Sequence, residues 1–286
     1  MSEPLVEKAC AKINLTLRVL GRREDGYHDL ESLVAFADFA DKLDLEPGQP
    51  EGLDISGPFA AGCDAGGDNL VLKAAMALRE RVGRLKSGRF LLDKRIPVAA
   101  GIGGGSADAA AAFRLLARAN DLALNDPRLE SAALDVGADV PVCLESRPRV
   151  MRGVGELLSA PIAMPPLPAL LVNPGVALPT RDVFAAFAGS EGSKIQVGTP
   201  PRERDAAIDF LARYGNDLAQ AAVRCAPVIT EVLMSLRALP GVRLARMSGS
   251  GPTCFALFRS LSEASAQARR LQAERKDWWV HAAMIG

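Results

Sequence analysis

Aromatic residues and histidine are scarce in this chain of 286 residues. Aromatics make up 5% of it, so the hydrophobic core must be built mainly from alanine, valine and leucine. There are two histidines, His28 and His281. Zinc sites and serine hydrolase triads usually depend on histidine. The scarcity therefore makes both kinds of site poor candidates.

No charge of one sign dominates, because 34 lysines and arginines balance 34 aspartates and glutamates. A general nucleic-acid binder would carry a basic excess, so we expect no nucleic-acid partner. The five cysteines are scattered, with no C-x-x-C pair. This pattern is typical of reduced thiols in the cytoplasm rather than of a disulfide framework or a zinc site.

The chain also lacks a long hydrophobic run. Its most apolar stretch, residues 160–172, is interrupted by four prolines and is too short for a membrane helix. The first eight residues contain two glutamates and no apolar run, unlike a signal peptide. We therefore expect a cytoplasmic protein with no membrane partner.

What the chain does contain is an irregular alternation of strand and helix patterns, which predicts an α+β fold. Its length suits two domains, and the proline cluster at 161–168 is the best linker candidate. We predict an N-terminal domain over 1–160 and a C-terminal domain over 161–286. Strands are expected at 6–20, 30–45, 89–93, 169–172, 242–247, 253–258 and 278–284. Helices are expected at 69–81, 107–116, 127–136, 182–187 and 262–274, with a helical tract at 205–239 that breaks near 214–216 and Pro227.

The most informative segment is a glycine-rich loop between a predicted strand and a predicted helix. Four glycines in five positions let backbone N–H groups converge on an anion, and the following helix adds its N-terminal donors and dipole. A purely structural turn, the alternative interpretation, would need fewer glycines. We interpret the loop as a phosphate site in which Ser106 could contact a phosphate oxygen or magnesium. The loop consists of Pro97, Val98, Ala99, Ala100, Gly101, Ile102, Gly103, Gly104, Gly105, Ser106 and Ala107.

The glycine motifs of the chain match none of the commonest signatures. A Walker loop needs a lysine just before the hydroxyl residue, where this chain has Gly105. The dinucleotide motif needs a third glycine where Ser106 stands. Farther along, Gly249-Ser250-Gly251 predicts a tight turn between two strands, and its spacing is not that of a nucleophile elbow.

Two other segments carry polar residues that suit phosphoryl transfer. Lys12 and Asn14 lie two apart in a predicted strand and therefore share a face, although a lone strand lysine is usually a solvated edge residue. Asp139 follows a predicted helix end and precedes a strand-like segment, where aspartate is more often a cap or turn residue. As a pair, an aspartate that accepts a hydroxyl proton and a lysine that stabilises developing charge are what a small-molecule kinase needs.

Taken together, these motifs resemble the GHMP kinase superfamily, which contains galactokinase, homoserine kinase, mevalonate kinase and phosphomevalonate kinase. The glycine loop is similar to the signature of the whole superfamily. Within it, the chain resembles the family of 4-diphosphocytidyl-2-C-methyl-D-erythritol kinases in several segments, of which the first two are the specific ones. These segments are residues 11–15, residues 26–32, the glycine loop through Asp108, residues 137–141 and residues 248–251.

The resemblance implies a two-domain GHMP kinase fold. Its N-terminal domain would bind ATP, its C-terminal domain would be an α/β-sandwich, and the active site would lie in the cleft between them. It implies ATP with Mg²⁺ as the donor. The reaction would be phosphorylation of the 2-hydroxyl of 4-diphosphocytidyl-2-C-methyl-D-erythritol in the non-mevalonate route to isopentenyl diphosphate. Lys12 and Asp139 match the catalytic pair of the family, and residues 97–107 match its ATP loop.

The resemblance also assigns the substrate site, where an aromatic and a histidine would recognise cytosine and a second aromatic would stack on it. The matching positions are Asn14, Tyr27, His28, Thr180 and Phe184. Two loop positions depart from the usual pattern of the family. Ile102 replaces a leucine, which should change little because the donors are backbone amides. Ala107 replaces a second serine, so one phosphate hydroxyl is missing. We expect a monomer or a weak homodimer.

Two alternatives stay open at this point. The chain could be another kinase of the superfamily, acting on mevalonate, homoserine or a sugar, which would need no cytosine pocket. It could also be a catalytically silent nucleotide-binding protein with the same fold. The presence of both Lys12 and Asp139 argues against the silent protein.

Overall fold

The computed structural model describes residues 4–189 and 196–286, and it combines helices and strands as predicted. The chain divides into two compact units, each made of segments that are discontinuous in sequence. Unit 1 comprises residues 1–11, 39–98 and 103–146, and unit 2 comprises residues 12–38, 99–102 and 147–286. The proposed domain boundary near residue 160 stays a prediction, and each unit is described by itself.

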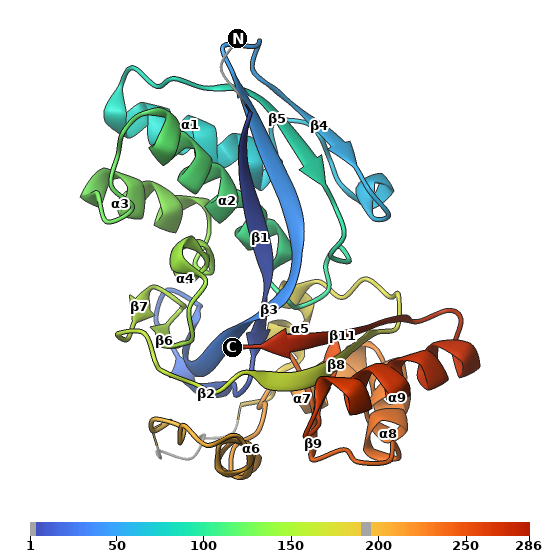
Figure 1. Ribbon diagram of the computed structural model, residues 1–286. Helices are drawn as coiled ribbons and strands as arrows, with labels where there is room; N and C mark the ends of the chain where they lie inside the picture. The colour runs from blue at the N-terminus through green and yellow to red at the C-terminus, as the bar shows by residue number, and fades with distance from the viewer. Residues whose placement is uncertain (1–3, 190–195) are drawn as a thin grey trace. The chain divides into compact units, whose positions relative to one another are not determined.

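Unit 1 is a sheet with helices on one side (Figure 1). Its strands β4 (Gly52–Ser56) and β5 (Gly88–Asp93) are parallel, and β5 is antiparallel to the second half of β3 (His28–Pro47). The helices are α1 (Leu70–Val82), α2 (Gly104–Ala119), α3 (Pro127–Val136) and the short α4 (Val140–Glu145). A single 3₁₀ turn, η1 (Ala60–Gly62), follows β4.

Helix α2 is the central helix of unit 1, in contact with α1, α3 and α4. Alanine has the highest intrinsic helix propensity, and its small side chain lets neighbouring helices approach closely. The buried face of α2 is accordingly rich in alanine, with Phe113 and Leu116 filling the larger spaces. This packing holds the start of α2, which carries the end of the glycine loop.

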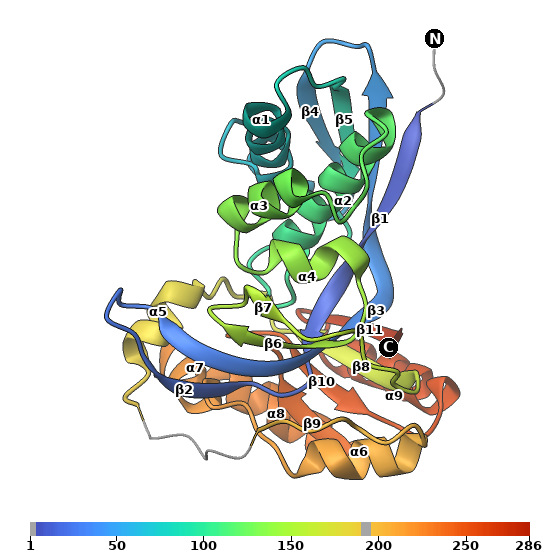
Figure 2. The same ribbon diagram turned by 90° about the vertical axis from the view of Figure 1, so that its left-hand side faces the viewer.

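Unit 2 contains a larger antiparallel sheet. Strand β8 (Leu167–Asn173) lies between β11 (Trp279–Ile285) and β10 (Cys254–Leu257), and β9 (Leu244–Met247) pairs with β10. Figure 2 shows a second antiparallel group, in which β2 (Arg18–Arg22) and β6 (Arg149–Gly153) pair with the first half of β3 and β7 (Leu157–Leu158) pairs with β6. Strand β1 (Leu5–Asn14) pairs with β3 and ends in this unit.

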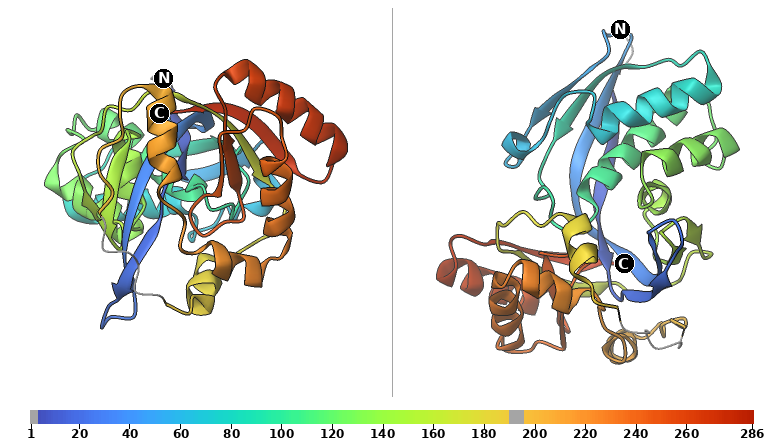
Figure 3. Two further views of the ribbon diagram at one scale, coloured as in Figure 1. Left: turned by 90° about the horizontal axis from the view of Figure 1, so that it is seen from below. Right: turned by 180° about the vertical axis from the view of Figure 1, so that it is seen from behind.

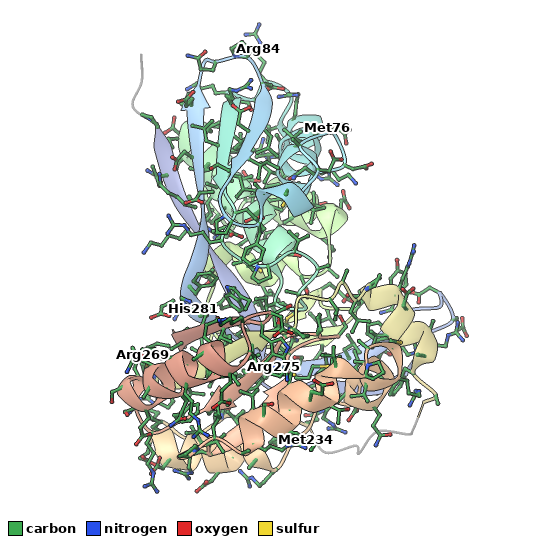
Figure 4. All side chains as sticks on the ribbon, turned by 90° about the vertical axis from the view of Figure 1, so that its right-hand side faces the viewer. Met76, Arg84, Met234, Arg269, Arg275 and His281 are labelled. Atoms are coloured by element: carbon green, nitrogen blue, oxygen red, sulfur yellow. The ribbon has the colours of Figure 1, made fainter. Side chains whose placement is uncertain are left out.

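The helices of unit 2 pack their apolar faces on this larger sheet. Figure 3 shows α8 (Val228–Arg237) and α9 (Leu261–Glu274) against the strands, where α8 contacts β9 and β10 and α9 contacts β8 and β11. On α8, Ile229 and Leu236 are buried in the core, whereas Met234 points to solvent on the opposite side (Figure 4). The remaining helices are α5 (Thr180–Ala186), α6 (Arg204–Ala212) and α7 (Ala219–Cys225).

Most of the predicted elements are present, and α3 has the predicted bounds. The helical tract after residue 204 breaks where predicted, into α6, α7 and α8. Two predictions are wrong. The strand expected over residues 6–20 is interrupted and forms β1 and β2, and the segment after Asp139 is helix α4 rather than strand-like. Proline is tolerated in a first helical turn because its missing N–H would have no partner there, so Pro141 does not prevent the helix. Within the described residues, no helix is long and apolar enough to cross a membrane.

Candidate active site

Lys12 and Asn14 lie at the C-terminal end of β1 and share a face, as predicted. Both are buried, with 3% and 6% of their surface exposed. Lys12 Nζ donates to Asn14 Oδ1 at 3.3 Å, and Asn14 Nδ2 donates to Ser32 Oγ at 2.7 Å. The interpretation of Lys12 as a solvated edge residue is therefore wrong.

The middle part of the glycine loop, Ala99–Ile102, belongs to unit 2 and is fixed by backbone hydrogen bonds. The N–H of Lys12 donates to the carbonyl of Ile102 at 2.9 Å. The N–H of Thr253 donates to the carbonyl of Ala100 at 3.2 Å. The loop is thus attached to the strand end that carries Lys12 and to the turn between β9 and β10.

Ser248 links the end of β1 to the glycine loop through its side chain. Its Oγ accepts the N–H of Asn14 at 3.0 Å and donates to the carbonyl of Gly101 at 3.2 Å. Asn216 supports the turn from the other side, because its Nδ2 donates to the carbonyls of Met247 and Gly249 at 2.9 and 2.8 Å. From its own residues, the segment predicted a tight turn, and it also carries part of the family resemblance. The contacts show that this turn holds the glycine loop.

The last part of the glycine loop belongs to unit 1 and forms the start of α2. Gly103 is the N-cap residue, in the left-handed conformation with φ of 64°, which glycine adopts without strain. Gly104, Gly105 and Ser106 make up the first turn, whose N–H groups have no acceptors within the helix. A helix N-terminus of this kind is suited to bind phosphate. Pro97 and Val98, the first two residues of the loop, belong to the same unit.

Asp139 lies in unit 1, directly before α4, and is half-buried. Its position after Gly137 agrees with the turn predicted at the end of α3. Lys12, the other predicted catalytic residue, belongs to unit 2. The structure therefore assigns the two members of the predicted pair to different units.

His28 and Phe184 come together within unit 2, although 156 positions separate them in the sequence. Their rings stack with centroids 5.1 Å apart and planes at 23°, and Phe187 meets His28 edge-on at 6.0 Å. Tyr27 is 65% exposed. Aromatic faces that stack in this way are the kind of surface on which a nucleobase binds.

Thr180, at the start of α5, is joined to the turn between β9 and β10. Its Oγ1 lies 2.9 Å from Ser250 Oγ, and either hydroxyl could be the donor. The turn that holds the glycine loop therefore also holds one of the predicted substrate residues. Ser250 did not stand out from the sequence, because a serine between two glycines is equally typical of a simple turn.

A group of three buried charges in unit 1 was not found from the sequence, apart from the mention of Asp108 in the loop motif. Lys94 is 3% exposed, Asp41 0% and Asp108 4%. The Lys94 ammonium donates to Asp41 Oδ2 and, at 2.6 Å, to Asp108 Oδ2. We call this group the Asp41–Lys94–Asp108 triad. It could not be predicted because Asp41 is distant in sequence from the other two.

The environment of the triad changes the acidity of its members. Burial raises the pKa of the Asp108 carboxyl to about 7; the Lys94 ammonium opposes this change and the charge of Asp41 adds to it. Burial by itself would lower the pKa of Lys94, but the two carboxylates outweigh it and raise that pKa. The ammonium therefore stays charged at neutral pH.

Comparison with known proteins agrees with this architecture. The model of the GHMP kinases N terminal domain matches residues 69–147, and that of the GHMP kinases C terminal domain matches residues 202–277. The first of these matches contains the glycine loop, α2 and Asp139. The second contains the turn between β9 and β10. The fold and the site thus define a GHMP kinase.

Similar proteins narrow the assignment. A 4-diphosphocytidyl-2-C-methyl-D-erythritol kinase from Rhodopseudomonas palustris is 56% identical over 98% of this chain and 99% of its own length. One from Bradyrhizobium diazoefficiens is 53% identical over 98% of each chain. A crystal structure of 4-(cytidine 5'-diphospho)-2C-methyl-D-erythritol kinase superposes with a TM-score of 0.78 at 38% identity, covering 99% of both chains. This chain therefore belongs to the 4-diphosphocytidyl-2-C-methyl-D-erythritol kinase family of GHMP kinases.

The fold extends beyond that family. A homoserine kinase structure from Cytophaga hutchinsonii has a TM-score of 0.73 at 18% identity, covering 99% of this chain and 95% of the other. At that identity the likeness concerns the fold alone. The acceptor must therefore be argued from the site and from the closer relatives.

Proposed function

We propose that this kinase transfers the γ-phosphoryl group of ATP to the 2-hydroxyl of 4-diphosphocytidyl-2-C-methyl-D-erythritol, a step of the non-mevalonate route to isopentenyl diphosphate. The observation that carries the proposal is the buried Lys12, whose backbone N–H is bonded to the glycine loop at Ile102. A charged side chain is thereby attached to the segment that would hold the donor. The names of the relatives at 53% and 56% identity support the acceptor.

In the proposed mechanism, phosphoryl transfer is direct, with no phosphoenzyme. Asp139 accepts the proton of the acceptor hydroxyl, and the oxygen of that hydroxyl forms a bond to the γ-phosphorus. The bond between the γ-phosphorus and the bridging oxygen breaks, and ADP leaves. Lys12 stabilises the charge on the acceptor oxygen and the transferred group, and the backbone N–H groups of the loop stabilise the phosphates.

Mg²⁺ is part of the proposal as the partner of ATP. It is usually held by one or two carboxylates together with substrate phosphates, and it keeps several waters. The described residues contain no group of three or more His, Cys, Asp or Glu that could hold a metal ion. Ser106, in the first turn of α2, would contribute its hydroxyl to the ion or to a phosphate. Bound Mg²⁺ would neutralise charge on the phosphates.

For the cytidine end of the acceptor, we propose binding by Asn14, Tyr27, His28, Thr180 and Phe184. The stacking of His28 with Phe184 and the exposure of Tyr27 support it, because they offer aromatic surface to a base. Asn14, beside Lys12, would contact the part of the acceptor that reacts.

The domain bounds, the cellular location and the oligomeric state are also proposals. We propose domains over 1–160 and 161–286, and the two family matches, which end at 147 and begin at 202, are consistent with that boundary. The five cysteines all lie in the described residues and form no disulfide, which supports a cytoplasmic location. For the oligomeric state we propose a monomer or a weak homodimer.

A phosphate-transfer assay with four acceptors tests the function: the cytidylated methylerythritol, mevalonate, homoserine and galactose. We expect turnover of the first alone. Turnover of another acceptor would favour a different kinase of the superfamily. ATP binding without turnover of any of the four would favour the silent nucleotide-binding protein.

The catalytic pair is tested with matched variants. Lys12→Ala should lower the rate on the order of a hundredfold or more, as the loss of a transition-state stabiliser does, whereas Lys8→Ala, exposed on the same strand, should not. Asp139→Asn should abolish turnover, whereas Asp135→Asn removes only an exposed ion pair with Arg81. Near-normal turnover by Asp139→Asn with ATP binding intact would show that Asp139 is not the base.

A further inference from the structure

The Asp41–Lys94–Asp108 triad has no role in the mechanism above, yet it connects the two ends of the glycine loop. Lys94 lies three residues before Pro97, and Asp108 follows Ala107 directly. Their ion pair at 2.6 Å therefore joins the chain before the loop to the chain after it. The whole of the predicted ATP loop, residues 97–107, lies between these two residues.

Asp41 also fixes the chain just before the loop, through hydrogen bonds to its backbone. Its Oδ1 accepts the backbone N–H groups of Arg95 and Ile96, at 2.5 and 2.7 Å. Its other oxygen accepts from the Lys94 ammonium. Since Asp41 lies on β3 and is fully buried, the start of the loop is attached to the sheet of unit 1.

Lys94 also lies close to the first turn of α2. A Cβ atom at Gly104 would come 3.2 Å from Lys94 Nζ and 3.1 Å from Ile96 Cγ2, closer than most real contacts of a Cβ. A glycine at this position thus leaves room for the ammonium beside the helix N-terminus. A Walker loop carries its lysine within the loop. In this chain the lysine lies outside the loop. Lys94 directly follows β5, and its ammonium group lies beside the start of α2.

Stability alone does not explain the triad. Buried ion pairs can often be replaced by apolar residues of similar volume without loss of stability. Here two carboxylates share one ammonium, and Asp108 Oδ1 is buried with no hydrogen-bond partner in the part of the chain that the structure describes. Such an arrangement is unfavourable unless its fixed geometry is needed.

We propose that the Asp41–Lys94–Asp108 triad positions the ATP loop. Held by two carboxylates, Lys94 sets the separation of the loop ends and directs the first turn of α2 toward the phosphates of ATP. All three are positioning residues, because the role requires none of them to touch the nucleotide. The inference rests on the proposed function only in taking ATP as the ligand of the loop.

The experiment measures the Kd of Mg·ATP by calorimetry, without acceptor, together with the thermal midpoint and the separate KM values for ATP and acceptor. Asp108→Asn keeps the size of the side chain and removes its charge. We expect it to stay folded, to raise the Kd and KM for ATP roughly tenfold, and to change the KM for the acceptor less than about twofold. Glu7→Gln, which removes ion pairs of Arg114 and Arg118 on the same helix α2, should leave the Kd for ATP unchanged.

A charge-free variant separates positioning from stability, in case single replacements unfold the chain. The triple variant Asp41→Asn, Lys94→Met, Asp108→Leu leaves no buried charge unpaired and should fold. We expect it to keep the weakened ATP binding. Wild-type affinity for ATP in the folded triple variant, or a lower thermal midpoint for Asp108→Asn with an unchanged Kd, would overturn the proposal. A wrong acceptor assignment would not affect these outcomes, because the binding assay contains no acceptor.

Discussion

Gly101→Ala should displace the backbone of the glycine loop as well as strain it. Gly101 has φ of +72°, in the left-handed region that L residues rarely adopt. A Cβ atom there would overlap the carbonyl oxygen of Gly251 and come 2.8 Å from its carbonyl carbon. The obstacle is backbone, so no rotation of a side chain can relieve it. Either the loop or the turn between β9 and β10 must move.

The cost has two parts. The left-handed conformation costs an alanine roughly 1–2 kcal/mol, and overpacking of this kind typically costs about 1–3 kcal/mol. The sum of about 2–5 kcal/mol is below the stability of most domains, about 5–15 kcal/mol. Gly101→Ala should therefore fold, with a thermal midpoint lowered by roughly 4–20 °C, given about 2–4 °C per kcal/mol for domains of about 150–250 residues.

Gly83→Ala is the matched control, because it isolates the conformational part. Gly83 ends α1 with φ of +78°, and, apart from its own helix and chain neighbours, no heavy atom of the described residues lies within 4 Å of the position that a Cβ atom would take there. Its replacement should cost only backbone strain, because φ of 78° with ψ of −97° is a conformation that glycine adopts far more readily than alanine, and it should leave ATP binding intact. Gly101→Ala should in addition weaken ATP binding. Each 1.4 kcal/mol needed to return the displaced loop to its ATP-binding conformation should raise the Kd for ATP about tenfold.

Differential scanning calorimetry of both variants, with ATP titrations of each, checks the reasoning. If Gly101→Ala left the thermal midpoint unchanged, the contact with Gly251 would not matter. If Gly101→Ala bound ATP with unchanged affinity, the loop would not depend on its packing against the turn between β9 and β10. Either result would refute the argument.

The other predictions concern stability. Phe258→Ala, in the fully buried core of unit 2, should lower the free energy of unfolding by roughly 3–5 kcal/mol in chemical denaturation. Asp126→Ala removes the side-chain cap of α3, which accepts the N–H of Arg128, and should cost about 1 kcal/mol, whereas Asp126→Ser should restore most of it. Because the folded pKa of Asp108 is raised, the wild-type chain should lose stability relative to Asp108→Asn as the pH rises between 3.8 and about 7. Thermal midpoints of the two chains that ran parallel across this window would contradict the raised pKa.

The sequence by itself determined the local elements and the motifs. Asp126, Pro127 and Gly137 mark the ends of α3 because capping, proline and glycine act through neighbouring backbone groups. The period of a strand placed Lys12 and Asn14 on one face. The glycine loop was recognised because its donors are its own backbone N–H groups, which need no distant partner.

The tertiary structure decided what each motif touches. The contact of Gly101 with Gly251, the stacking of His28 on Phe184 and the Asp41–Lys94–Asp108 triad join residues far apart in sequence. Local patterns extend over a few residues, so they carry no information on which segments meet. The helix after Asp139 illustrates the same limit, because the short apolar run of α4 fits a strand or a helix equally well until it packs on α2. Local backbone preferences thus set the elements, and the burial of their apolar faces against one another decided which side chains became neighbours.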